Sequence, residues 1–367
     1  ERIEKLKDEI FSLMGLEKFN LNSPKQLGEA LFIRLGLPYP GGKTKSYSTD
    51  AETLEKIIAH HPAISKILEY RHISKLNSTY VVPLCEKADK NGRIHSSFDQ
   101  AGAVTGRISS NDPNLQNIPT RSLEGREIRK AFIAKEGYIL IDADYSQIEL
   151  RILAHISGDE NMLNAFRQNQ DIHRSTASSI ENVPLSEVTD EQRSAAKAVN
   201  FGIVYGISDF GLARNIGIPI WKANEFINKY FEKYPKIKDL MEELQRTAEE
   251  KGYAETLYGR RRSLPELKSK NHNLRSFAKR AAINTPIQGS AADIIKLAMI
   301  RVHERLKKEK LDAKLILQVH DELIIEAEEG IKAYVSKLLK EEMEKVVHLK
   351  LPLLADVNTG KNWYESK

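Results

Sequence analysis

Residues 315–325 read Leu315-Ile316-Leu317-Gln318-Val319-His320-Asp321-Glu322-Leu323-Ile324-Ile325, with two apolar runs on either side of a polar centre. This pattern is typical of a β-hairpin with acidic residues at its turn. Earlier in the chain, Asp142 and Asp144 follow the apolar run Tyr138-Ile139-Leu140-Ile141. The sequence therefore predicts two places at which a buried strand delivers carboxylates.

The residues between these strands have a different character. Helical periodicity dominates from about Gln147 to Leu306, so a strand-bearing part is interrupted by about 160 largely helical residues. Residues 1 to about 85 also read as helices separated by turns, and the fold class is therefore α+β. The helices expected in this first part are Ile3 to Met14, a helix opened by Ser23-Pro24, Asp50 to Ile57, and Ala63 to Leu76.

Length and composition narrow the class of protein. The 367 residues are enough for two or three domains. With 29% charged and 41% hydrophobic residues and a mean hydropathy of −0.45, a membrane-spanning or a disordered protein is excluded. The single cysteine, Cys85, forms no internal disulfide, so we expect a reducing, cytoplasmic setting. Because the chain opens at Glu1 in a charged helical pattern, we interpret it as a fragment of something longer.

Positive charge is concentrated rather than spread along the chain. The net charge is +5, yet residues 251–280 alone carry nine Lys or Arg against two Glu. Such a stretch is either a solvated surface or the binding face for a polyanion. The glycine-rich loop from Pro40 to Ser48 adds two cations, Lys43 and Lys45, with hydroxyl groups suited to gripping phosphates.

The carboxylates and one helix have the residue types that bind metal ions and nucleotides. Two carboxylates on adjacent strands suit a pair of divalent cations, although acids at strand ends are more often turn residues or caps. A capping box at Thr189 and Gln192 predicts a helix start. Two cations and then two aromatic rings follow at four-residue spacing. This pattern is suited to binding a triphosphate and a stackable base, but it also occurs on amphipathic helices with surface charges. These residues are Arg193, Lys197, Phe201 and Tyr205, with Ala196, Val199 and Ile203 on a separate apolar stripe.

Three segments, in order, resemble the signature motifs of the DNA polymerase I family (family A): Asp144-Tyr145-Ser146-Gln147-Ile148-Glu149-Leu150-Arg151, the helix from Arg193 to Gly206, and Gln318 to Glu322. Further segments also look like family segments: Thr105 to Ser110, Asn114 to Pro119, Asp171 to His173 and Asn284 to Asp293.

The resemblance covers essentially the whole chain and implies the right-hand architecture of the Klenow-type polymerase region. Residues 1–85 match a helical thumb that lacks its first turns. Residues 86–152 and 275–367 match the antiparallel-sheet palm, and residues 153–274 match the helical fingers. Relatives carry exonuclease-like and nuclease domains upstream, so we expect no proofreading or 5′-nuclease activity from these residues.

The resemblance also implies roles for individual residues. Asp144 and Asp321, with the main-chain carbonyl of Tyr145, are expected to bind two Mg²⁺ ions, for which Mn²⁺ is a possible substitute. Lys197 is the candidate that protonates the departing pyrophosphate, and Glu149, braced by Tyr205, is expected to exclude ribonucleotides. The nucleotide-binding residues implied are Gln147, Glu149, His173, Arg193, Lys197, Phe201 and Tyr205.

Primer-template DNA and deoxynucleoside triphosphates are the partners that the resemblance implies, for a monomeric enzyme. Pro286 lies among the expected DNA contacts and is compatible with either the start or a kink of a helix. The DNA-binding residues implied are Lys43, Lys45, Arg107, Asn114, Gln116, Asn117, Arg121, Arg280, Asn284, Gln288 and His320.

Two other functions fit part of the pattern. A two-metal nuclease also needs paired carboxylates and a basic surface, but it does not need Arg193, Lys197 and Phe201 on one helix. An inactive DNA-binding subunit is disfavoured because every expected catalytic side chain is present. The sequence therefore favours a template-directed DNA polymerase that acts in replication and repair.

Overall fold

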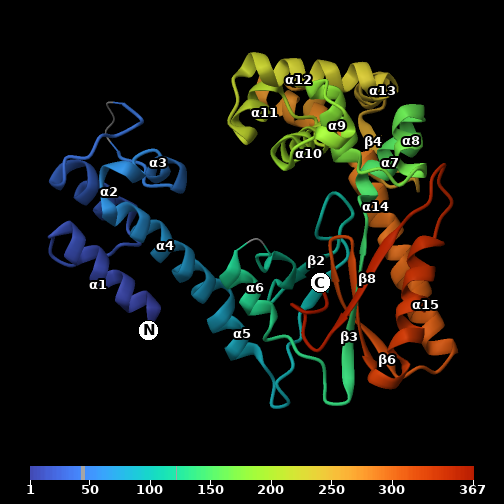
Figure 1. The fold of residues 1–367 in the computed structure, drawn as a ribbon, viewed down its shortest axis with the longest axis horizontal. Helices are drawn as coiled ribbons and strands as arrows, with labels where there is room; N and C mark the ends of the chain where they lie inside the picture. The colour runs from blue at the N-terminus through green and yellow to red at the C-terminus, as the bar shows by residue number, and fades with distance from the viewer. Residues whose placement is uncertain (43–45, 121) are drawn as a thin grey trace. The chain divides into compact units, whose positions relative to one another are not determined.

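The computed structural model describes residues 1–42, 46–120 and 122–367 (Figure 1). These residues form two compact units: a small unit of residues 1–96 and 118–129, and a large unit of residues 97–117 and 130–367. Lys43, Lys45 and Arg121, which the sequence predicts to bind DNA, lie outside the described residues.

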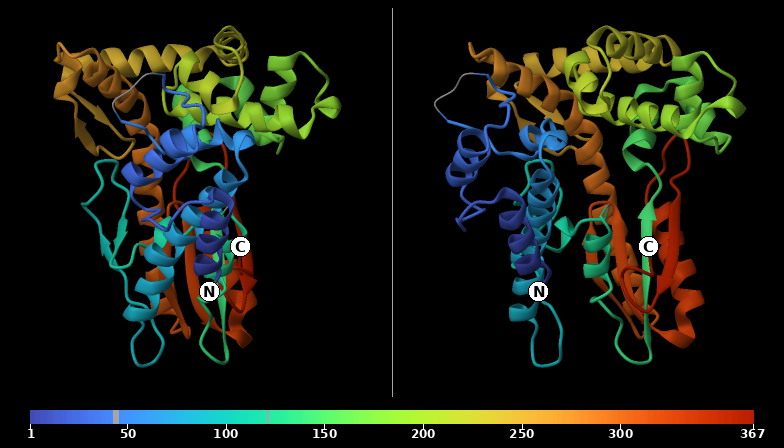
Figure 2. Two further views of the ribbon diagram at one scale, coloured as in Figure 1. Left: turned by 90° about the vertical axis from the view of Figure 1, so that its left-hand side faces the viewer. Right: turned by 60° about the vertical axis from the view of Figure 1, so that its left-hand side comes forward.

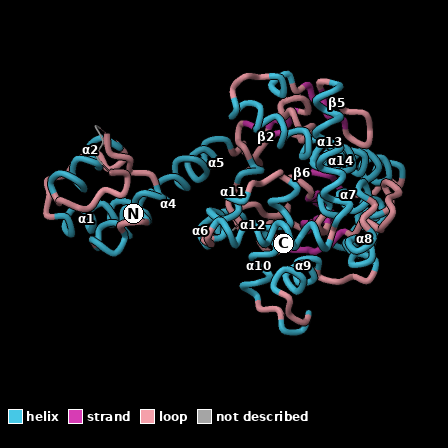
Figure 3. The backbone as a smooth tube through the Cα atoms, turned by 90° about the horizontal axis from the view of Figure 1, so that it is seen from above, coloured by secondary structure: helices cyan, strands magenta, loops and turns pink. Residues whose placement is uncertain are grey.

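The small unit is helical, as Figure 3 shows. Helices α1 and α4 pack together in its hydrophobic core, where Ile10, Ile64 and Ile67 have no exposed surface. The side chains of Ser23 and Asp50 cap helices, which confirms the predicted starts. Its elements are α1 (Arg2–Met14), α2 (Pro24–Gly28), η1 (Glu29–Arg34), α3 (Ala51–Glu55), η2 (Ile58–His60), α4 (Pro62–Leu76), η3 (Asn77–Val81), α5 (Val82–Lys87) and α6 (Leu123–Arg129).

A four-stranded antiparallel sheet lies at the centre of the large unit. Its order is β6 (Ala313–Val319), β7 (Glu322–Glu328), β3 (Tyr138–Tyr145) and β8 (Ala355–Gly360). Strands β6 and β7 form the predicted hairpin. Strand β3 differs from the expectation in one respect, because it continues through Asp142 and Asp144 to Tyr145 instead of ending before them.

The two faces of this sheet have different surroundings. Alternate residues of a strand point to opposite faces. Ile139, Ile141, Ala143 and Tyr145 belong to the main hydrophobic core, with the helix residue Leu338. Asp142 and Asp144 therefore lie on the other face, which is how one strand supplies both core residues and carboxylates.

Helices occupy the chain between β3 and β6, as predicted. In Figures 1 and 2, α7 to α13 gather beyond the end of the sheet at which β3 leads into α7. These elements and the remaining ones of the large unit are β1 (Ser97–Asp99), β2 (Ser109–Asn111), η4 (Leu115–Asn117), α7 (Ile148–Ser157), α8 (Glu160–Arg167), α9 (Ile172–Glu181), η5 (Leu185–Glu187), α10 (Asp190–Val204), α11 (Asp209–Ile216), α12 (Ile220–Lys233), α13 (Pro235–Lys251), β4 (Tyr253–Glu255), β5 (Arg261–Ser263), η6 (Pro265–Lys268), α14 (His272–Lys308), η7 (Glu329–Ile331) and α15 (Lys332–Glu344).

Three features bear on the sequence-based expectations. Pro286 lies inside α14, so it does not begin a helix. The basic stretch forms the β4–β5 hairpin, η6 and the start of α14. Within the described part of the chain, no helix is both long enough and apolar enough to cross a bilayer.

The four-part division into thumb, palm and fingers stays a prediction. The sheet and the inserted helices belong to the same compact unit, because α7, α10 and α13 share a hydrophobic core with β3 and β7. The sheet and the inserted helices are therefore packed as one body.

Candidate functional site

Strand pairing brings the two predicted carboxylates to one end of the sheet. Asp144 of β3 lies opposite Glu322 of β7, and Asp321 precedes Glu322 at the hairpin tip. The tip is a two-residue turn in which His320 has a φ of 55°, the left-handed conformation that such turns require. The main-chain N–H of Tyr145 donates to the carbonyl oxygen of Asp321 at 3.2 Å. Backbone hydrogen bonds therefore fix the positions from which Asp144 and Asp321 project.

The electrostatics of this pair suit a cation. Burial, and after it the charge of Asp144, raises the pKa of Asp321 to about 7. Burial also raises the pKa of Asp144, against the opposing charge of Lys367. Oδ1 of Asp144 is buried and has no hydrogen-bond partner. A divalent cation would supply the missing partner and stabilise both charges, so these residues fit the Mg²⁺ that the resemblance implies.

The candidate ligand set is small. Within the described ranges, no group of three or more histidine, cysteine, aspartate or glutamate side chains is arranged to hold a metal ion. Two carboxylates and the carbonyl oxygen of Tyr145 remain as the protein ligands that the sequence predicts. Mg²⁺ usually keeps several waters and takes further oxygens from substrate phosphates, so a set of this size suits it.

Glu322 and Asp142 lie behind the pair and are more deeply buried, with exposed fractions of 2% and 3%. Glu322 accepts a hydrogen bond from Nε1 of Trp363 at 2.9 Å, and Lys367 donates to its other oxygen. Burial, followed by the charge of Glu322, raises the pKa of Asp142 to about 9. Against the effect of burial, the pKa of Glu322 is lowered by Lys367 and by the hydrogen bond with Asp142, so a proton shared by the two favours Asp142 and Glu322 carries the charge that faces Lys367.

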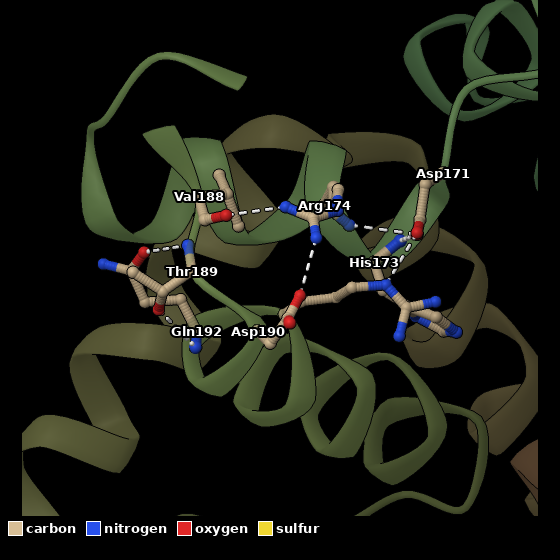
Figure 4. Close-up of polar contacts among 8 residues, drawn as sticks. Asp171, His173, Arg174, Val188, Thr189, Asp190 and Gln192 are labelled. Carbon is tan, nitrogen blue, oxygen red and sulfur yellow. Dashed lines mark hydrogen bonds and ion pairs between the residues drawn. The ribbon is translucent and has the colours of Figure 1, made fainter. Parts of the chain in front are cut away.

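Helix α10 has the predicted start and the predicted faces. The Thr189–Gln192 capping box is present, as Figure 4 shows. Ala196, Val199 and Ile203 are buried, which confirms the apolar stripe. On the other stripe, Nε of Arg193 donates to Oδ2 of Asp171 at 2.6 Å. Asp171 also caps α9 by accepting from the main-chain N–H groups of His173 and Arg174.

His173 lies beneath α10. It is 2% exposed, and its Nδ1 lies 3.0 Å from the amide nitrogen of Asn200. Burial, opposed in part by Asp171, lowers the pKa of His173 to about 4. Its ring lies 5.7 Å from the Phe201 ring, and the Lys197 ammonium lies 6.0 Å from the centre of the same ring. The structure thus groups His173, Lys197 and Phe201, with a neutral imidazole at physiological pH.

Glu149 is held from two sides. One carboxylate oxygen accepts from Arg107 at 2.7 Å, and the other accepts from the Tyr205 hydroxyl at 3.2 Å. The side chain is nearly buried, with a residue exposure of 7%. The expected contact with Tyr205 is therefore present, while the ion pair with Arg107 was not expected from the sequence. Gln147 adopts the left-handed conformation just before α7 and so re-aims the chain between Asp144 and Glu149.

The predicted DNA-binding residues of the large unit fall into two groups. On α14, Asn284 has a buried amide nitrogen without a partner, Gln288 is buried, and Arg280 packs against Gly206. The amide of Gln116 donates to the carbonyl oxygen and to Oε1 of Gln318, so it is tied to the hairpin that bears His320. Asn114 and Asn117 are exposed near η4.

Sequence reasoning missed Trp363 and Lys367. Both follow β8, and neither belongs to a motif with recognisable spacing. A Trp and a Lys in this part of the sequence do not identify a partner 41 or 45 residues earlier in the chain.

Comparisons with known proteins identify the family to which the chain is similar. The sequence model of DNA polymerase family A matches residues 1–365. DNA polymerase I from Caldicellulosiruptor bescii is 52% identical over all of this chain and 43% of its own length. DNA polymerase I from Geobacillus stearothermophilus is 50% identical over all of this chain and 42% of its own length. The chain therefore spans about two fifths of these relatives.

The fold is similar to that of a polymerase whose structure has been solved. The POL domain of Pol1 from M. smegmatis, in complex with DNA primer-template and dNTP, superposes with a TM-score of 0.93 and 42% identity, covering 99% of this chain and 64% of that one. The right-hand α+β fold expected from the sequence is thereby confirmed. On this evidence the chain belongs to DNA polymerase family A.

Proposed function

We propose that the chain is a DNA-directed DNA polymerase that adds deoxynucleotides to a primer 3′-hydroxyl by nucleotidyl transfer, in DNA replication and repair. The observation that carries this proposal is the pair of partly buried carboxylates at one end of the sheet, Asp144 on β3 and Asp321 at the tip of the β6–β7 hairpin, with an unpartnered oxygen on Asp144. The M. smegmatis relative supports it, since that POL domain was solved with DNA primer-template and dNTP.

Asp144, Asp321 and the carbonyl of Tyr145 would hold two Mg²⁺ ions, or Mn²⁺ in their place. When bound, such ions lower the pKa of the primer hydroxyl and neutralise charge on the pyrophosphate. The protein supplies the orientation: β3 and the hairpin tip fix both carboxylates through backbone hydrogen bonds. Glu322 stays behind them and is bonded to Trp363 and Lys367, so it is not assigned as a ligand.

The triphosphate would bind along α10. Arg193 and Lys197 provide positive charge, and His173, neutral at physiological pH, can donate a hydrogen bond but not a charge. Lys197 is the residue proposed to protonate the pyrophosphate. Asp171 pairs with Nε of Arg193 here, and the proposal is that this pair opens when Arg193 binds the phosphates. An inward swing of α10 on binding the correct nucleotide would provide that opening.

The sugar and base would lie beside Glu149, Phe201 and Tyr205, with Gln147 close by in the chain. Glu149 cannot retreat easily, because Arg107 and Tyr205 hold both of its oxygens. A 2′-hydroxyl would meet this fixed, nearly buried carboxylate. We therefore assign Glu149 to the exclusion of ribonucleotides.

Primer-template DNA would contact the residues of η4, α14 and the hairpin tip. Asn284 supports this assignment, because an unsatisfied buried donor is costly unless a ligand accepts from it. Minor-groove acceptors occupy nearly the same places in every base pair, which suits an enzyme that must accept any sequence. The enzyme is proposed to act as a cytoplasmic monomer, without proofreading or 5′-nuclease activity from these residues.

Primer extension with pyrophosphate detection tests the proposal. Pyrophosphate must appear only when primer-template, the matched dNTP and Mg²⁺ are all present, with one pyrophosphate for each nucleotide added. Strand shortening without nucleotide would instead support the two-metal nuclease, and DNA binding without either product would support the inactive DNA-binding subunit.

A further inference from the structure

The segment 361–367 folds back against the sheet after β8. The N–H of Trp363 donates to the carbonyl of Phe132 at 2.9 Å, and the N–H of Ser366 donates to that of Asn362 at 3.1 Å. Ser366 has no exposed surface. A Cβ on Gly360 would lie 2.5 Å from the nitrogen of Ser366, so the close return of the chain requires glycine there. The position of Lys367 is therefore set by an ordered backbone.

Trp363 anchors this segment to the carboxylate cluster. Its side chain is 1% exposed, and its ring meets that of Phe132 edge to face at 5.4 Å. Its Nε1 donates to Oε1 of Glu322 at 2.9 Å. This bond satisfies one oxygen of Glu322, and a cation contacts the other.

Lys367 provides that cation. Its ammonium donates to Oε2 of Glu322 and lies 3.7 Å from Oδ2 of Asp144. It therefore faces one oxygen of each carboxylate, while Oδ1 of Asp144 stays without a partner. The Lys367 side chain is 39% exposed and Glu322 is 2% exposed, so solvent screens this contact only in part.

The strand register explains why a cation is needed at this place. Asp144 and Glu322 lie directly opposite each other on β3 and β7, and directly opposed like charges destabilise a sheet. A fixed ammonium between them offsets that repulsion. The same positive charge also repels any divalent cation that approaches Asp144.

We propose that Lys367 is a positioning residue with two linked effects: it offsets the repulsion between Asp144 and Glu322 and orients both when no metal is bound, and it weakens metal binding at Asp144. The inference rests on the proposed metal-binding role of Asp144 and Asp321. It makes Lys367 the residue that sets the metal concentration at which the site fills.

Direct Mn²⁺ binding, followed by the electron paramagnetic resonance signal of the free ion, tests this without any catalytic readout. Removing the charge in Lys367→Gln should tighten Mn²⁺ binding by about tenfold, since a unit charge close to the ion no longer repels it. Lys367→Met, which keeps the aliphatic stem, should do the same. Lys367→Arg should bind as the parent does.

Lys361→Gln is the matched control. Lys361 belongs to the same segment, but its ammonium pairs with Glu329 at 2.7 Å, away from the cluster. This variant should leave Mn²⁺ affinity unchanged. The Mg²⁺ concentration for half-maximal primer extension should fall in Lys367→Gln by the same factor as the Mn²⁺ dissociation constant.

The outcomes separate this inference from the proposed function. Unchanged or weaker Mn²⁺ binding in both neutral variants overturns the inference, as does Lys367→Arg binding as tightly as they do. Asp144→Asn is included in the same titration. If it loses Mn²⁺ and the Lys367 variants do not shift, only the inference fails. If it binds Mn²⁺ as the parent does, the proposed function fails as well.

Discussion

The strand-borne and helix-borne halves of the site are organised differently. Asp144 and Asp321 project from backbone positions locked by β-ladder hydrogen bonds, whereas Arg193 of α10 is held by an exchangeable ion pair with Asp171. A half fixed by backbone hydrogen bonds can be ready before any ligand binds, because there is little reorganisation left to make. A half fixed by side-chain pairs must exchange partners on binding. The difference predicts that changes in the first half abolish the reaction and changes in the second half adjust it.

The largest effect is expected in the strand-borne half. Asp144→Asn or Asp321→Asn should abolish primer extension and leave primer-template affinity nearly intact, because these acids serve metal ions and DNA affinity comes chiefly from distributed cations. Extension rates and DNA dissociation constants are the measurements. Asp239→Asn, the same change at an exposed position on α13, is the control and should behave as the parent. Extension near the parent rate in either active-site variant would contradict the assignment.

The next effect is expected where the two halves meet, at Glu149. Glu149→Ala removes the carboxylate that Arg107 and Tyr205 hold, which opens space beneath the sugar. Ribonucleotide incorporation relative to deoxynucleotides should rise by at least about tenfold, corresponding to ~1.4 kcal/mol of recovered transition-state stability. The ratio of kcat/KM for matched ribo- and deoxynucleotides measures this.

Tyr205→Phe sharpens the Glu149 prediction. It removes only the hydroxyl that bonds to Glu149 and leaves the ion pair with Arg107 in place. A smaller shift of the same sign is expected. An unaltered ratio in Glu149→Ala would mean that this carboxylate does not border the sugar.

A smaller effect is expected on α10 itself. Phe201 has no hydroxyl with which to replace the missing 3′-hydroxyl of a dideoxynucleotide, so Phe201→Tyr should relax discrimination against these substrates. A gain of one hydrogen bond, ~1 kcal/mol, corresponds to roughly fivefold in relative incorporation. The assay is competition between matched dideoxy- and deoxynucleotides. Unchanged discrimination would show that Phe201 does not face the sugar.

The sequence predicted well whatever depends on local pattern. The hairpin around His320, the capping box at Thr189 and the apolar stripe of α10 follow from periodicity and turn chemistry, and the structure contains all three. The strand β3 was predicted to end before Asp142, but it continues to Tyr145. It can include Asp142 and Asp144 because both lie on the face of the sheet opposite the hydrophobic core. Apolar runs alone therefore underestimate such a strand.

The ion pairs between residues far apart in the chain could not be predicted from the sequence. Arg107 pairs with Glu149, Arg193 with Asp171, and Lys367 with Glu322, and no periodicity relates the members of any pair. Ion-pair partners depend on tertiary placement, and a lysine or arginine in sequence has many carboxylates to choose from. The family resemblance supplied the contact between Tyr205 and Glu149, yet it gave no indication of what Arg193 contacts before a nucleotide arrives.

The smallest effect concerns this last pair. Asp171→Asn keeps the cap on α9, because asparagine also accepts from main-chain N–H groups, but it removes the charge that holds Arg193. If α10 must release Arg193 before it binds the triphosphate, the KM for dNTP should fall by about two- to fivefold, since a partly exposed pair contributes ~1 kcal/mol or less. Asp190→Asn is the matched control, because Asp190 pairs with Arg174 at 2.6 Å on the same two helices (Figure 4). It should leave the KM unchanged. A raised KM in Asp171→Asn would show instead that the pair pre-orients Arg193 for the phosphate, and the helix-borne half would then be as preorganised as the strand-borne half.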